Sequence, residues 1–107
     1  MSAIPTTTVL ELPDDAVLVD VREADEWAAG HAPNAIHIPL AELPARIDEL
    51  PESDDTVAIV CRMGGRSARA VMWLVHQGYD VANVEGGMLA WQRAGKRLTA
   101  EREPTII

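Results

Sequence analysis

Short runs of consecutive apolar residues recur along the chain. The longer segments between them carry apolar residues three or four positions apart. Two of these runs, 17–19 and 57–60, are continuously apolar and rich in valine. Such runs are typical of strands that are covered on both faces of a sheet. Two further candidates, each interrupted by one polar residue, lie at 36–38 and 81–84. The pattern therefore predicts four buried strands.

The segments between these runs carry the spacing of helices. From 67 to 77 the apolar residues fall on one helical face, and Gly78 follows where a helix usually ends. Residues 23–29 and 88–94 are each followed by a glycine and predict shorter helices, while 40–50 predicts a helix broken near Pro44. Strands and helices that alternate in short units indicate an α/β fold with a central parallel sheet and helices on both faces. In such sheets, ligands bind beyond the carboxyl ends of the strands.

The length of 107 residues is that of one domain. We expect a single domain over 1–107, with a core at about 9–98 and a C-terminal tail at 99–107. The acidic loop 51–55 and the residues from Lys96 onward show no periodicity, so we expect both to be peripheral. The longest apolar run, 70–75, is far too short to cross a bilayer, and the N-terminal residues do not resemble a secretory signal. The sequence thus predicts a cytoplasmic protein without a membrane partner.

Charge narrows the range of ligands. Nine basic and seventeen acidic residues give a net charge of −8, which disfavours binding to nucleic acid or to an anionic membrane. Between Thr56 and Tyr79, however, there is no acidic residue, and three arginines stand there: Arg62, Arg66 and Arg69. A cationic island in an acidic protein favours binding of a small anion at one place. The alternative is a solvated basic helix end.

Cys61 is the one cysteine of the chain. A chain with one cysteine cannot form an intrachain disulfide or a zinc site made of four cysteines. Any redox or group-transfer chemistry at this thiol therefore involves an outside partner.

The segment 57–67 places this cysteine at the expected ligand-binding edge. A predicted strand delivers Cys61 to its carboxyl end, and the next helix opens six residues later. So short a loop has to curl, and the glycine pair 64–65 permits the backbone angles that a curl requires. Its amides, the helix N-terminus and two neighbouring guanidinium groups would favour a thiolate and a small anion.

The plainer interpretation of a cysteine at the end of an apolar strand is a small buried side chain. We favour a reactive thiol because a loop rich in glycine and arginine has no evident packing purpose. Ser67 is expected to be the N-cap of the following helix. His31 and His37 are interpreted as structural hydrogen-bonding residues, and the three tryptophans as core residues.

Three motifs resemble, in their order and spacing, those of single-domain rhodaneses, which are members of the thiosulfate sulfurtransferase family. The resemblance extends over about 9–98. The motifs are Asp20-Val21-Arg22-Glu23 with Trp27, Gly30-His31 and Ala35 to Pro39; the loop 61–67; and Val84-Glu85-Gly86-Gly87-Met88 with Ala90-Trp91.

This resemblance implies a rhodanese-like fold and roles for particular residues. It implies that Cys61 is the nucleophile that carries sulfur, and that Arg66 binds the sulfonate end of the donor. Asp20 and Arg22 would support the loop from a neighbouring strand end. The cradle of the persulfide would be formed by Arg62, Met63, Gly64, Gly65, Arg66 and Ser67.

The leading hypothesis is an enzyme, a thiosulfate sulfurtransferase. It would move a sulfane sulfur from thiosulfate, or a similar small anionic donor, through a Cys61 persulfide. The acceptor would be cyanide in an assay, or cellular thiols including protein thiols. Neither a metal nor an organic cofactor is required, because the nucleophile is ionised and sulfite leaves as a stable anion.

Two alternatives stay open at this point. One is a non-catalytic rhodanese-like module that carries or senses sulfur. The other is a cysteine-dependent phosphatase or arsenate reductase, but those enzymes have a longer loop between cysteine and arginine. Here only four residues, 62–65, separate Cys61 from Arg66. Such a loop fits one sulfur atom better than a phosphate.

Overall fold

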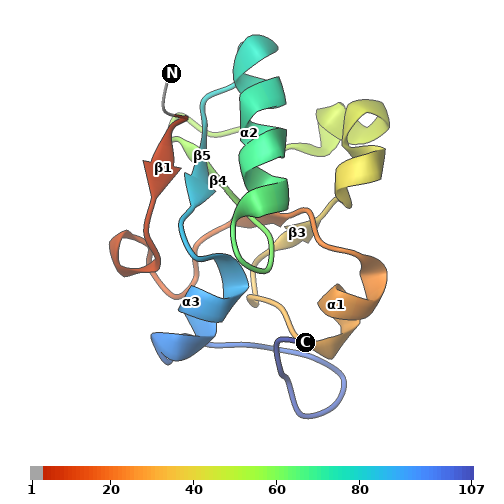
Figure 1. Ribbon diagram of the computed structural model, residues 1–107, viewed down its shortest axis with the longest axis vertical. Coiled ribbons are helices and arrows are strands. Elements are labelled where there is room, and N and C mark those ends of the chain that lie inside the picture. The colour runs from red at the N-terminus through yellow and green to blue at the C-terminus, as the bar shows by residue number, and fades with distance from the viewer. Residues whose placement is uncertain (1–3) are drawn as a thin grey trace.

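Five parallel strands form the sheet at the centre of the molecule (Figure 1). The structure is a computed structural model and describes residues 4–107. The strands pair in the order β1-β5-β4-β2-β3, and all four pairings are parallel. Their bounds are β1 (Thr6–Thr7), β2 (Leu18–Asp20), β3 (Ile36–His37), β4 (Val57–Val60) and β5 (Val81–Val84).

Helices cover both faces of this sheet. The α-helices are α1 (Ala24–Ala29), α2 (Gly65–His76) and α3 (Gly87–Arg93), and the 3-10 segments are η1 (Val9–Glu11) and η2 (Leu40–Glu49). On one face, α2 and η2 pack against alternate residues of the strands, including Val19 and Ile59. On the other face, η1 and α3 pack against the intervening residues, such as Leu18 and Val60. The predicted α/β fold with helices on both faces is confirmed.

Strand β4 has the central place that its apolar sequence predicts. It pairs with β5 on one side and with β2 on the other, and its last three residues are buried. Since consecutive side chains point to opposite faces, Ile59 enters one core cluster while Ala58 and Val60 enter the other. Cys61 follows directly at the carboxyl end of this strand, where it is 1% exposed.

Two expectations about the elements need correction. Strand β1 is not apparent in the sequence because its two residues are threonines, which form no apolar run. Helix α2 begins at Gly65, two residues earlier than predicted. The predicted break near Pro44 is confirmed: η2 is interrupted at Arg46, whose φ of −119° and ψ of 22° are not helical. None of the helices formed by residues 4–107 has the length and apolar character needed to span a bilayer.

The C-terminal tail is not peripheral, contrary to the prediction. The amide of Thr105 donates to Ala29 O at the end of α1, and Ile106 is 8% exposed in the core cluster that contains Trp91. Figure 1 shows the C-terminus lying beside α1 at the lower end of the molecule. A single buried isoleucine in a segment without helix or strand produces no periodicity, so the pattern of the sequence does not reveal this packing.

Candidate active site

The loop between β4 and α2 curls around the sulfur atom of Cys61. Gly64, the residue before α2, has a φ of 113°, in the left-handed region that side chains other than glycine rarely adopt. This turn brings the Gly64 amide within 3.1 Å of Cys61 Sγ. The glycine therefore supplies the curl that the sequence predicts for this loop.

Hydrogen-bond donors surround the sulfur from the loop and from the first turn of α2. Besides the Gly64 amide, the hydroxyl oxygen of Ser67 lies 3.2 Å from Cys61 Sγ. Burial by itself raises the pKa of the Cys61 thiol, but the Ser67 hydroxyl and the amides of Ser67, Gly64 and Met63 together outweigh it. The net result is a pKa below the ordinary value for cysteine, as expected for a nucleophilic thiol.

Ser67 is not the helix N-cap that the sequence predicts. Gly64 occupies the cap position, and Ser67 lies in the first turn of α2, completely buried. Its hydroxyl oxygen also lies 2.5 Å from Oδ1 of Asn83, a residue of β5. Asn83 in turn donates from Nδ2 to Gly64 O at 3.2 Å. Sequence reasoning missed Asn83, although a polar residue within the apolar run 81–84 was a visible signal.

The N-terminus of α3 supports the loop from behind. The amides of Met88 and Leu89 donate to Cys61 O and Arg62 O, at 2.8 and 3.1 Å. Gly87 makes this approach feasible: a Cβ built there would lie 2.5 Å from Arg62 O and closer still to Cys61 O. Backbone hydrogen bonds thus join the loop to α3, and the close approach of the two segments leaves no space for a side chain at Gly87.

Arg66 forms an ion pair that the sequence did not reveal. Its Nη1 and Nη2 atoms lie 2.6 and 2.8 Å from the two carboxylate oxygens of Glu26, a residue of α1. Hydrogen bonding to Arg66 holds the pKa of Glu26 at about 2. Glu26 and, more weakly, Cys61 raise the pKa of Arg66 above its ordinary value. The guanidinium group thus lies within electrostatic range of the thiol while it is anchored by a carboxylate.

This ion pair predicts a pH dependence of stability. The pKa of Glu26 is lower in the folded protein than the ordinary value of 4.5, so the stabilisation is fully present above about pH 5. It is lost as the pH falls towards 2. We expect Glu26→Gln to lower the free energy of unfolding by about 1 to 2 kcal/mol at neutral pH, and by roughly half of that or less at about pH 3. Urea unfolding of the wild-type protein and Glu26→Gln at the two pH values measures the difference in their free energies of unfolding. The same difference at both pH values would contradict the prediction.

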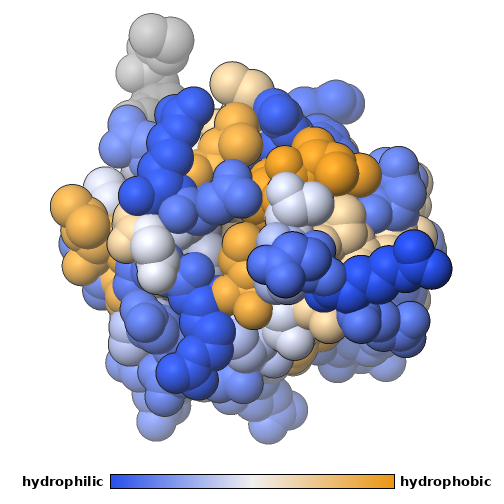
Figure 2. All heavy atoms as spheres, turned by 90° about the horizontal axis from the view of Figure 1, so that it is seen from below, coloured by the Kyte–Doolittle hydropathy of each residue, from blue (hydrophilic) through white to orange (hydrophobic). Residues whose placement is uncertain are grey.

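The other two arginines of the cationic island have different surroundings. Arg62 donates from Nε to Ile107 O at 2.8 Å, which joins the loop to the C-terminal tail. Arg69 is exposed on α2, where it lines a small hollow beside Trp73. Next to Arg62, the side chain of Met63 is 63% exposed. Figure 2 views the end of the molecule where α1, α3 and the C-terminus lie, and shows apolar side chains dispersed among hydrophilic ones.

Asp20 and Arg22 form a fully buried ion pair at the end of β2, next to the end of β4. Arg22 Nη2 lies 2.8 Å from Asp20 Oδ2 and also donates to Gly30 O at 2.8 Å. Arg22 Nη1 has no hydrogen-bond partner among residues 4–107. The pair therefore fixes the turn after α1, and its hydrogen bonds do not reach the loop 61–67. Its support of that loop stays a prediction.

The two histidines have the structural roles expected of them. His31 Nδ1 lies 2.7 Å from Trp27 O, and His37 Nε2 lies 2.8 Å from Arg22 O. The Trp27 ring stacks on both imidazoles, with centroid distances of 3.5 and 4.8 Å. Of the tryptophans, Trp91 is fully buried, whereas Trp27 and Trp73 are only partly buried.

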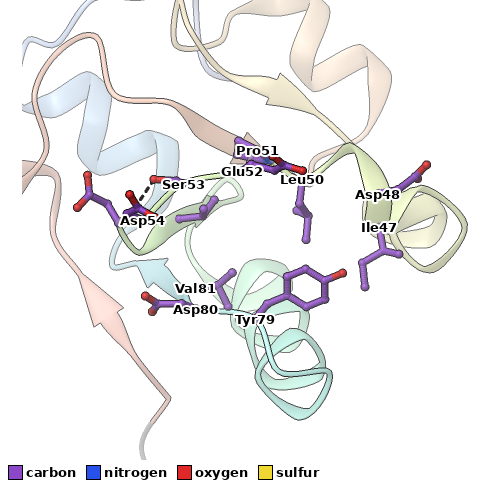
Figure 3. Close-up of a pocket in the computed structure, with 12 residues that line it drawn as sticks. Ile47, Asp48, Leu50, Pro51, Glu52, Ser53, Asp54, Tyr79, Asp80 and Val81 are labelled. Carbon is purple, nitrogen blue, oxygen red and sulfur yellow. Dashed lines mark hydrogen bonds between the residues drawn. The ribbon is translucent and has the colours of Figure 1, made fainter.

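A cavity of about 770 Å³ lies away from this site (Figure 3). Tyr79 and the apolar side chains of Ile47 and Leu50 face its interior, and carboxylates lie around them. The loop 51–55 contributes much of the lining. None of the residues 61–67 lines this cavity, so its size has no bearing on the candidate active site.

Comparisons with known proteins identify a family for this chain. The family model described as "Rhodanese-like domain" matches residues 6–94. A protein named "Sulfurtransferase" from Allochromatium vinosum is 42% identical over 88 residues, which cover 81% of each chain. The "Putative sulfur carrier protein YrkF" of Bacillus subtilis is 41% identical over 75 residues, 69% of this chain and 40% of that protein.

Solved structures agree as well. The crystal structure of a rhodanese-related protein from Thermoplasma volcanium superposes with a TM-score of 0.80 at 35% sequence identity. The match covers 91% of this chain and 99% of that one. The fold and the family relationship therefore extend over nearly the whole chain.

Proposed function

This chain belongs to the rhodanese-like domain family, and on that basis we propose that it moves a sulfane sulfur from thiosulfate to a thiophilic acceptor through a persulfide on Cys61. Its relatives support a rhodanese-like role in sulfur transfer. The observation that carries the proposal is the position of Cys61 Sγ, within hydrogen-bond distance of the Gly64 amide and the Ser67 hydroxyl oxygen. These contacts suit a thiolate, and the same curl of amides suits the sulfur attached to it.

The reaction has two steps that balance. The Cys61 thiolate attacks the outer sulfur of thiosulfate, a new S–S bond forms, and sulfite leaves with the electron pair of the old one. Cyanide or a thiolate then attacks the outer sulfur of the persulfide, and Sγ leaves as the thiolate. The donors around Sγ stabilise that thiolate before the first step and after the second.

Steady-state kinetics test this mechanism. Because one thiol carries the sulfur between two substrates, thiocyanate formation should follow ping-pong kinetics, with parallel double-reciprocal lines when thiosulfate and cyanide are varied. Intersecting lines would contradict a free persulfide intermediate. Hydrolysis of an aryl phosphate in place of thiocyanate formation would mean that the reaction class is wrong.

Arg66→Ala tests the proposed site for the sulfonate of the donor. Glu26 occupies one edge of the Arg66 guanidinium group and leaves its other N–H groups for an anion. We expect kcat/KM for thiosulfate to fall by roughly 10 to 100-fold, equivalent to about 1.4 to 2.7 kcal/mol. Enzyme assays at fixed ionic strength measure the effect.

A matched control comes from the same helix. Arg69 is exposed and has no carboxylate partner among the described residues. Arg69→Ala should therefore change kcat/KM by less than about twofold. Equal losses in the two variants would indicate a general effect of positive charge instead of a sulfonate site at Arg66.

A second candidate function is that of a sulfur carrier loaded by another protein. The name of the Bacillus subtilis relative and the engagement of Arg66 by Glu26 favour it. A carrier would form the same Cys61 persulfide but would take sulfur from a protein persulfide much faster than from thiosulfate. Comparing the loading rates from thiosulfate and from a persulfidated protein distinguishes the two functions.

A further inference from the structure

Three buried groups form a chain that begins at the sulfur of Cys61 and ends at the carbonyl group of Gly64. Ser67 Oγ lies 3.2 Å from Cys61 Sγ and 2.5 Å from Asn83 Oδ1. At the other end of the amide, Asn83 Nδ2 donates to Gly64 O at 3.2 Å. A carbonyl oxygen only accepts hydrogen bonds, so this last contact fixes the orientation of the amide and directs Oδ1 towards Ser67.

The serine hydroxyl has one proton and two candidate acceptors. Two oxygen atoms 2.5 Å apart repel each other unless a proton lies between them, and Asn83 Oδ1 has none to give. In the resting protein the proton of Ser67 therefore points to Asn83. While that proton lies between Ser67 and Asn83, the 3.2 Å contact between Ser67 Oγ and Cys61 Sγ has a proton only when the thiol is neutral and its S–H donates to Ser67 Oγ.

Ionisation of the thiol reverses one link of this chain. A thiolate has no proton to donate, and it attracts the hydroxyl proton of Ser67 more strongly than a neutral acceptor does. When that proton turns to Sγ, Asn83 Oδ1 loses its donor in a place where the residue is only 8% exposed. A buried carbonyl without a donor is unfavourable. The thiolate therefore gains the hydrogen bond from Ser67 only when the hydrogen bond from Ser67 to Asn83 Oδ1 is lost.

We propose that Asn83 is a positioning residue that holds the hydroxyl proton of Ser67 away from Cys61 and thereby opposes ionisation of the thiol. It acts through Ser67 and does not touch the sulfur. The inference about the resting thiol stands on these contacts alone. Its consequence for catalysis rests on the proposed function: a less stable thiolate is a poorer leaving group, so Asn83 slows discharge of the persulfide.

The pH titration of the Cys61 thiol measures the effect of Asn83 on its ionisation. As the one cysteine of the chain, it gives the only thiolate signal in the ultraviolet absorbance, and subtracting the Cys61→Ser protein removes the contribution of Tyr79. We expect Asn83→Leu, which cannot accept the proton, to move the midpoint to lower pH. At a pH below both midpoints, its thiolate fraction should be about three- to tenfold that of the parent protein.

Ser67→Ala supplies the decisive comparison. Without the hydroxyl, Asn83 has no proton to withhold, so Asn83→Leu should leave the midpoint of the Ser67→Ala protein unchanged. An effect through loop geometry would persist there, because the hydrogen bond to Gly64 O is lost in either background. An unchanged or higher midpoint in the single Asn83→Leu variant, or an equal shift in both backgrounds, would overturn the proposal.

Asn83→Asp keeps the proposal testable if the leucine variant does not fold. A carboxylate holds the serine proton more strongly and adds a negative charge, so the midpoint should move to higher pH, and more so with Ser67 present than with Ser67→Ala. A midpoint that falls, or that shifts equally in both backgrounds, would contradict the role of Asn83. Absence of sulfur transfer in the parent protein would contradict the proposed function but would leave the titration result valid.

Other charges near the site are common to all these variants. None of them is altered by substitution at position 67 or 83. They are Arg62 in the loop, Arg66 of α2 with Glu26 of α1, the Asp20–Arg22 pair after β2, His37 of β3 and Glu85 after β5. Their effects on the titration therefore cancel in each comparison.

Discussion

Cys61→Ser should reduce thiocyanate formation from thiosulfate and cyanide by at least about a thousandfold. A serine hydroxyl is not ionised at neutral pH and forms no persulfide, whereas the amides and the guanidinium group around it remain. Since residue 61 is buried at the end of β4 and the two side chains have similar sizes, the variant should fold. Thermal unfolding and a thiocyanate assay on the same preparation check both statements. Turnover near the wild-type rate would contradict the role of Cys61.

Gly87→Ala should disrupt the active site without touching a side chain in it. The added methyl group would overlap the carbonyl oxygens of Cys61 and Arg62, in a residue whose φ is 58°. The loop, α3 or both have to move, and the hydrogen bonds from Met88 and Leu89 weaken. We expect a loss of about 2 to 4 kcal/mol in the free energy of unfolding, and of at least about tenfold in kcat/KM. Chemical denaturation and the thiocyanate assay measure the two losses.

Gly95→Ala is the matched control for this prediction. Gly95 also has a positive φ, 73°, but a Cβ there would meet no atom within 4 Å. Its replacement should cost about 1 kcal/mol for the backbone conformation alone and leave sulfur transfer unchanged. If the two alanine variants lose equal stability and both keep full activity, the close approach of Gly87 to the loop has no functional importance.

The parts of the fold that are visible in the sequence are those that bury continuous apolar runs. Strand β4 follows directly from its buried apolar run, and helix α2 follows from a helical spacing that buries one face, at Ser67, Ala70, Val71 and Leu74. The other face of α2 is more exposed than its apolar sequence suggests, since Met72 and Val75 are 54% and 44% exposed. Strand β1 is not predicted, because its two threonines form no apolar run and pair with β5 through backbone groups. The packing of the tail is not predicted because its buried side chain, Ile106, belongs to no helical or strand pattern.

The site is predictable only as far as its residues are neighbours in the chain. The position of Cys61 at a strand end and the curl at Gly64 follow from local sequence. The partners of the loop come from distant segments: Glu26 is 40 residues from Arg66, and Asn83 is 16 residues from Ser67. Pairings of this kind depend on the order of the strands, which the local pattern does not specify.

The most direct test of the account is the intact mass of the protein after incubation with thiosulfate and removal of the free reagent. The account predicts that the wild-type protein gains the mass of one sulfur atom, that Cys61→Ser gains none, and that cyanide removes the added sulfur. The same gain in Cys61→Ser, or turnover by a wild-type protein that never carries sulfur, would contradict the proposal that Cys61 is the carrier.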